Sequence, residues 1–126
     1  MSLDINIQKL SNHCKISLNG KCTIYNVGKL KEFLITAIET NENILIDLSL
    51  VNDFDTAGLQ LFVSAKNMVN SKNKKMKIVN HPVCVLSVFD LYGLISFFGD
   101  KITVKPEEKK QFVFNYGIKK RPFLKY

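Results

Sequence analysis

Cysteine, histidine and long apolar runs are all scarce in this chain of 126 residues. The cysteines are three, an odd number, and no CxxC pair or Cys/His cluster with metal-ligand spacing joins them: they are Cys14, Cys22 and Cys84. This pattern argues against a disulfide framework and against a zinc site. The sequence therefore predicts a protein of a reducing compartment that holds neither a metal nor a cofactor.

The chain also lacks targeting and membrane segments. No stretch approaches the roughly 20 apolar residues of a membrane span, and the opening MSLDINIQKL carries a charge at Asp4 and has no apolar core of signal-peptide length. We therefore expect a cytoplasmic protein without an integral membrane segment.

Signatures of catalysis are missing as well. There is no GxxxxGK followed by Ser or Thr and no GxGxxG, so nucleotide hydrolysis and dinucleotide binding have no motif behind them. His13 falls in a strand pattern and His81 in a loop before Pro82, and a lone histidine is more often a surface or satisfied polar residue than a catalytic base. We expect no enzymatic activity.

The positive charge is concentrated at the C-terminus. Residues 105–126 hold seven basic and two acidic side chains, so they carry five of the seven net positive charges. The same segment is rich in aromatic residues, namely Phe112, Phe114, Tyr116, Phe123 and Tyr126. We predict one domain over 1–104 and a basic, aromatic-rich extension over 105–126. An extension that packs its aromatic rings on the domain is favoured over a nucleic-acid platform or a membrane-surface contact.

Hydrophobic periodicity indicates the order of the elements. Apolar and polar residues alternate over 3–8 and 14–19, which predicts a hairpin that turns at Ser11-Asn12. We then expect a helix at 26–40, a buried strand at 44–48, a helix at 57–71, a strand at 76–79, a helix from Pro82 to about Leu91 and a short strand at 102–104. This order predicts an α/β fold with a mixed sheet, built from the N-terminal hairpin and strand-helix-strand units, with helices packed on the sheet.

The segment that carries chemistry is Asp53-Phe54-Asp55-Thr56-Ala57-Gly58-Leu59, where a buried strand meets a helix. Open α/β sheets place their sites at the carboxyl ends of their parallel strands, and helix N-termini favour anions. A phosphate on Thr56 would add about −1.5 to −2 charges, stabilised in part by the helix start and opposed by the neighbouring aspartates. The alternative is that Asp and Thr are ordinary capping residues and that Gly58 only permits close packing.

Two longer segments carry a family resemblance. ILIDLSLVNDFDTAGLQLF and MKIVNHPVCVLSVFDLYGLISFFGD resemble the STAS domain, the fold of anti-sigma factor antagonists and of the cytoplasmic tails of sulfate transporters. The resemblance extends over about residues 3–104, and its most specific parts are DTAGL and FDLYGL. In regulatory members the hydroxyl residue after the Asp of the Asp-Ser/Thr-x-Gly-Leu motif is phosphorylated, which corresponds to Thr56 here.

The resemblance implies a non-catalytic module of bacterial signal transduction and transcription regulation. The unphosphorylated domain would dock on an anti-sigma factor that is also a serine/threonine kinase of the histidine-kinase-like ATPase fold, and phosphorylation would release it. Two residues depart from the frequent pattern: Thr56 stands where many antagonists have Ser, and Ala57 replaces a second hydroxyl residue. An alternative is therefore an accessory STAS subunit that binds another ATPase without phosphorylation, in a chemotaxis or two-component pathway or in a phospholipid ABC transporter. Nucleic-acid binding through the C-terminal extension is a further alternative.

The expected partner-binding residues cluster on the DTAGL segment. They are Phe54, Asp55, Thr56, Gly58, Leu59 and Lys66. Phe54 is either a core residue or an exposed interface anchor, and Lys66 lies at the core edge or faces a partner. Asp53 and Asp90 are interpreted as solvated charges next to helices. The chain is expected to be a monomer or a weak homodimer.

Overall fold

A computed structural model describes residues 2–102 of the chain. The N-terminal hairpin opens the sheet: β1 (Leu3–Leu10) pairs antiparallel with β2 (His13–Cys22). The turn between them needs only Ser11 and Asn12, and Ser11 takes a left-handed φ of 56°. Residue 1 and residues 103–126 lie outside the described part, and with them the predicted C-terminal extension.

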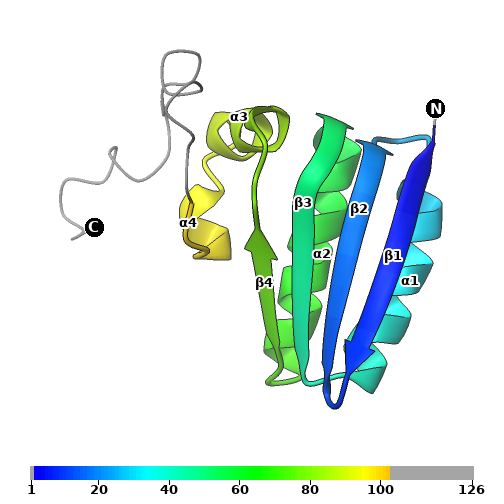
Figure 1. The fold of residues 1–126 in the computed structure, drawn as a ribbon. Coiled ribbons are helices and arrows are strands. Elements are labelled where there is room, and N and C mark those ends of the chain that lie inside the picture. Colours follow the sequence, from blue (N-terminus) through cyan, green and yellow to red (C-terminus); the bar gives the residue numbers. More distant parts are fainter. Residues whose placement is uncertain (1, 103–126) are drawn as a thin grey trace, which may run out of the picture.

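Two strand-helix-strand crossovers build the rest of the sheet. α1 (Val27–Thr40) connects β2 to the parallel β3 (Asn43–Phe54), and α2 (Thr56–Ser71) connects β3 to the parallel β4 (Lys75–Val79). The strand order is β1-β2-β3-β4. Figure 1 shows α1 and α2 side by side on one face of this sheet.

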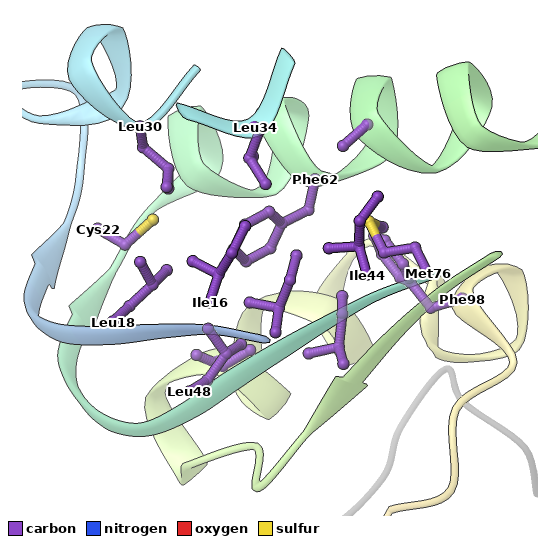
Figure 2. Packing of buried hydrophobic residues seen from close by; sticks show 14 of the residues in the cluster. Ile16, Leu18, Cys22, Leu30, Leu34, Ile44, Leu48, Phe62, Met76 and Phe98 are labelled. Atoms are coloured by element: carbon purple, nitrogen blue, oxygen red, sulfur yellow. The ribbon is translucent and has the colours of Figure 1, made fainter. Parts of the chain in front are cut away.

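The core lies between that face and the two helices. Leu30 and Leu34, one helical turn apart on α1, and Phe62 of α2 point toward Ile16 and Leu18 of β2 (Figure 2). All five side chains are at most 1% exposed. Burying a side chain of this size stabilises the fold by about 1.5–3 kcal/mol, so this contact layer determines where the N-terminus of α2 lies.

A second apolar cluster closes the end of β3. α3 (Val83–Leu91) begins after Pro82 and is followed by the short helix α4 (Ile95–Phe98). The ring of Phe89 stacks on Phe98 at 4.6 Å between centroids and contacts Phe54 edge-on at 5.9 Å. α3 ends in a tight turn because Gly93, with φ 67°, accepts the left-handed conformation that this turn requires.

Most of the expected elements are confirmed. The helices predicted at 26–40 and 57–71 form at Val27–Thr40 and Thr56–Ser71, and the hairpin and the mixed sheet are as expected. β3 is longer than predicted, because it continues past residue 48 to Phe54. α4 was not anticipated. Of the strand predicted at 102–104, Ile102 has no regular structure and the other residues are not described.

Candidate functional site

Asp55 organises the junction between β3 and α2. It is the N-cap residue of α2, and its Oδ1 accepts the backbone N–H groups of Ala57 at 3.0 Å and Gly58 at 3.2 Å. Its Oδ2 accepts the backbone N–H of Ile24 at 3.0 Å. One carboxylate therefore caps α2 and also holds the β2–α1 loop against the start of this helix. The structure thus gives Asp55 a structural role as a capping residue.

Thr56 is the first residue of α2, and its side chain is exposed. We expected the start of the helix to stabilise a phosphate on this hydroxyl in part. The structure limits that contribution, because Asp55 already accepts two of the N–H groups that a helix leaves free at its N-terminus. Asp53, two residues before Asp55, is exposed as predicted. The helix start would therefore offset less of an added negative charge at Thr56 than the sequence predicts.

Gly58 is buried and is required for close packing. A Cβ at this position would lie 2.8 Å from the carbonyl oxygen of Cys22 and 2.9 Å from a ring carbon of Phe54. Burial, with the charge of nearby Asp55, raises the pKa of the Cys22 thiol to about 12, so this thiol is a neutral packing group beneath α2. The partner-binding role expected for Gly58 is therefore corrected: it lets the first turn of α2 approach β2.

Phe54 belongs to the core. Its side chain is 5% exposed, and its ring lies 5.7 Å from that of Phe62 and 5.9 Å from that of Phe89. The interpretation as an exposed interface anchor is wrong, because β3 extends to Phe54 and α3 covers its end. The prediction that Asp90 is a solvated charge is also wrong, since this residue is only 3% exposed.

A groove begins at Thr56 and follows one face of α2. Its volume is about 590 Å³, and the connection from α3 to α4 forms its other wall. We call it the α2 groove; its lining residues are Thr56, Leu59, Gln60, Val63, Ser64, Tyr92 and Leu94. Leu59, one of the predicted partner-binding residues, is 4% exposed and forms part of the floor.

Several groove residues were missed by the sequence analysis. Positions 56, 59, 60, 63 and 64 recur at helical spacing, so one face of α2 could have been recognised. Tyr92 stands in the FDLYGL segment that carries the resemblance, and it is 52% exposed. Nothing in the sequence indicated that this tyrosine lies across a groove from Thr56.

The β2–α1 loop adds exposed apolar surface next to Asp55. Ile24 is 62% exposed and Tyr25 is 74% exposed, and the bond from Ile24 N–H to Asp55 holds this loop beside the start of α2. We call the α2 groove together with Ile24 and Tyr25 the docking face. Exposed aromatic and aliphatic side chains around a groove are the usual anchors of protein interfaces.

Lys66 lies apart from the docking face. It is ten residues beyond Thr56 on α2, about 15 Å along the helix axis, and it does not line the groove. Its charge acts on Asp100 instead: burial raises the pKa of the Asp100 carboxyl, while Lys66 and Lys77 oppose that shift. Lys66 stays a predicted partner-binding residue, although it lies beyond the part of α2 that lines the groove.

The two histidines occupy opposite environments, neither of them in the groove. His13 is exposed on β2, whereas His81 is 6% exposed and packs edge-on against Phe89 at 5.9 Å. Burial lowers the pKa of His81 to about 4, so its ring is neutral at physiological pH. Among residues 2–102 no three His, Cys, Asp or Glu side chains gather in a way that could hold a metal ion, and no helix is long and apolar enough to cross a membrane.

Known proteins share this architecture. An anti-sigma-B factor antagonist of Bacillus subtilis is 26% identical over 94 residues, which are 75% of this chain and 86% of that protein. An anti-sigma factor antagonist of Mycobacterium paratuberculosis superimposes with a TM-score of 0.73 at 17% identity and covers 82% of this chain and 88% of its own. SpoIIAA in its unphosphorylated form gives a TM-score of 0.67 at 16% identity, over 89% of this chain and all of its own.

Residues 5–98 match the family model described as Mlab, STAS domain. That range includes all of the hairpin except its first two residues, the DTAGL segment at the start of α2, and both helices that follow β4. It amounts to well over half of the chain, and the fold is similar to those of the two solved antagonists. The chain belongs to the STAS domain family.

Proposed function

We propose that this chain is a non-catalytic regulatory module that binds a protein partner through the docking face and is switched by phosphorylation of Thr56. One observation carries the proposal: the Thr56 side chain is exposed at the rim of a groove flanked by apolar side chains. A kinase can reach the hydroxyl, and a partner seated in the groove would cover it.

The charges near Thr56 support a switch of this kind. A phosphate would place about −1.5 to −2 charges beside the carboxylates of Asp53 and Asp55, of which Asp55 already occupies the nearest helix N–H groups. A bound partner would have to desolvate or repel this charge. A hundredfold loss of affinity requires only about 2.7 kcal/mol, which is within the range of a like-charge contact in an interface.

The relatives suggest the chemistry of the partner. Because the B. subtilis protein acts on an anti-sigma factor, as its name states, we propose an anti-sigma factor with kinase activity and the histidine-kinase-like ATPase fold as the partner, in the cytoplasm. Such a partner would supply both the binding surface and the ATP-derived phosphate.

The test is a binding assay with the full chain as bait. Wild type, Thr56→Ala and Thr56→Glu are compared in pull-downs from native lysate, with mass spectrometry and then titration of the captured kinase. Thr56→Ala should bind like unphosphorylated wild type, and Thr56→Glu should lose at least a hundredfold in affinity. The control is Asn12→Glu, an exposed position in the β1–β2 turn at the opposite end of the sheet, which adds the same charge and should change nothing. Equal binding by Thr56→Glu would refute the switch.

A second candidate is an accessory subunit that binds an ATPase permanently. It is favoured by Ala57, which leaves a single hydroxyl at the start of α2, and by a groove that needs no phosphate to form. This reading predicts stable co-purification that resists Thr56→Glu but is lost on Tyr92→Ala, because Tyr92 forms a wall of the groove.

Nucleic-acid binding through residues 105–126 stays a prediction, since these residues lie outside the described part. It would give binding that weakens steeply with salt and that disappears when the chain is truncated at Pro106.

A further inference from the structure

The two edge strands of the sheet, β1 and β4, differ in whether another segment covers them. At β4 the carboxylate of Asp100 accepts the backbone N–H of Ile78, so the segment after α4 covers that edge. At β1, within residues 2–102, no element lies further out (Figure 1). An uncovered strand edge presents unpaired N–H and C=O groups that can pair with another strand.

The hairpin shows which backbone groups of β1 point outward. Lys21 N–H donates to Ser2 C=O at 3.0 Å, so residue 2 and residue 21 form a hydrogen-bonded pair. In an antiparallel ladder such pairs alternate, and the two-residue turn after Leu10 agrees with this phase. The N–H and C=O groups that point away from β2 therefore belong to the odd-numbered residues Leu3, Ile5, Ile7 and Lys9.

The side chains of these same residues lie on the face covered by α1. Ile7 is 41% exposed there, and Phe33 of α1 beside it is 37% exposed. Together with Cys14 and Ala37 they line a groove of about 350 Å³ along the β1 edge, whose polar rim includes Lys9 and Glu32. An open backbone edge is thus combined with an apolar groove, which is the arrangement that accepts an added strand.

We propose that this edge binds a second copy of the same chain, with β1 antiparallel to β1 of the other copy around a two-fold axis at Asn6. The axis is normal to the sheet, so one sheet runs through both copies and both α1 helices lie on the same face. Ile5 of each copy then lies opposite Ile7 of the other, and the outward N–H and C=O groups of the odd-numbered residues pair.

The pattern of β1 is complementary to itself in this register. Asp4 lies opposite the Gln8 amide and Lys9 opposite Leu3, so no two like charges face each other across the axis. Glu32, the other charged residue that lines the β1-edge groove, carries a charge opposite to that of Lys9. Thr56 lies at the far end of β3, two strands from the edge, so the dimer leaves both docking faces open.

The first test measures the mass of the full chain by sedimentation over a range of concentrations. Wild type should shift from 14.4 kDa toward twice that mass. Ile7→Lys, which places like charges near the axis, should weaken association at least tenfold. The matched control is Leu50→Lys, which is 59% exposed on the inner strand β3 and should behave as wild type. A wild-type chain that remains 14.4 kDa at about 1 mM, far above the dissociation constants typical of specific interfaces, overturns the proposal, as does unaltered association of Ile7→Lys.

The second test examines the register. Asn6 faces its own counterpart as a non-hydrogen-bonded pair, the closer type of cross-strand pair. In a Cys84→Ser background, which removes the one native thiol that is not buried, Asn6→Cys should form a disulfide-linked dimer under mild oxidation. Asn19→Cys, exposed on β2, is the control. Equal cross-linking of the two variants would contradict the register, and loss of the cross-link on adding Ile7→Lys would support it.

Discussion

At both ends of the sheet a charged side chain caps a helix terminus, but among the described residues only one end also carries a candidate binding site. At one end Asp55 satisfies the N-terminus of α2; at the other end the Lys74 ammonium contacts the C-terminal carbonyls of Ile38 and Glu39 on α1, the latter at 3.3 Å. Each is a charged side chain that complements a helix terminus. Next to Asp55, however, stand an exposed hydroxyl and the α2 groove. Capping is therefore ordinary at both ends, and what distinguishes the candidate site is the exposed Thr56 beside a groove.

The largest expected effect separates core from surface at the Thr56 end. Phe54→Ala should lower the free energy of unfolding by about 3–5 kcal/mol, because it leaves a cavity between Phe62 and Phe89. Tyr25→Ala, at a side chain that is 74% exposed, should change it by less than about 0.5 kcal/mol. Urea denaturation measures both. If Phe54→Ala changed the free energy of unfolding by less than about 1 kcal/mol, the assignment of Phe54 to the core would be contradicted.

The next effect is a pH dependence that comes from His81. The pKa of this buried ring is lowered to about 4 from the ordinary 6.5, so between these values the unfolded chain binds more protons than the folded one. The neutral His81 ring contributes its full share of the free energy of unfolding above pH 6.5. As the pH falls toward 4, this contribution decreases by up to about 3 kcal/mol.

Urea denaturation at pH 7 and pH 4.5 measures this dependence. His81→Leu should flatten it, whereas His13→Gln, at an exposed position on β2, should leave it as in wild type. An unchanged slope in His81→Leu would assign the effect to other groups.

A smaller effect is expected at the cap of α2. Asp55→Ala removes the acceptor of two helix N–H groups and of the Ile24 N–H, and should cost about 1–2 kcal/mol. Asp55→Asn keeps an oxygen acceptor and should lose less. Amide hydrogen exchange at Ile24, Ala57 and Gly58 should report the loss locally, and protected amides in Asp55→Ala would contradict the capping role.

The smallest effect is expected at the opposite end of the sheet. Lys74→Met keeps the aliphatic stem and removes the charge at the C-terminus of α1, which should cost about 0.3–1 kcal/mol. It should not alter partner binding, because the docking face lies at the other end. If Lys74→Met weakened binding as strongly as Thr56→Glu, the distinction between the two ends would fail.

Local patterns predicted the elements well and the surroundings of side chains poorly. The helical period from Val27 and the alternation in the hairpin reported which faces are apolar, and those elements form where expected. Phe54 lacked such a signal, because its burial depends on α3, which comes nearly thirty residues later. Asp90 was expected in solvent but is buried. The reason is related: hydrophobic periodicity shows which face of a helix is apolar, but not which other element covers the polar residues beside that face.

Residues close together in the chain were enough to predict the order of the elements from β1 to α3, the position of DTAGL at the start of a helix, and the family. The packed fold was needed to show that Gly58 must lack a side chain beneath α2 and that Tyr92 lies across a groove from Thr56. These depend on how α2 and α3 pack on the end of β3, and packing brings together residues that no local pattern relates.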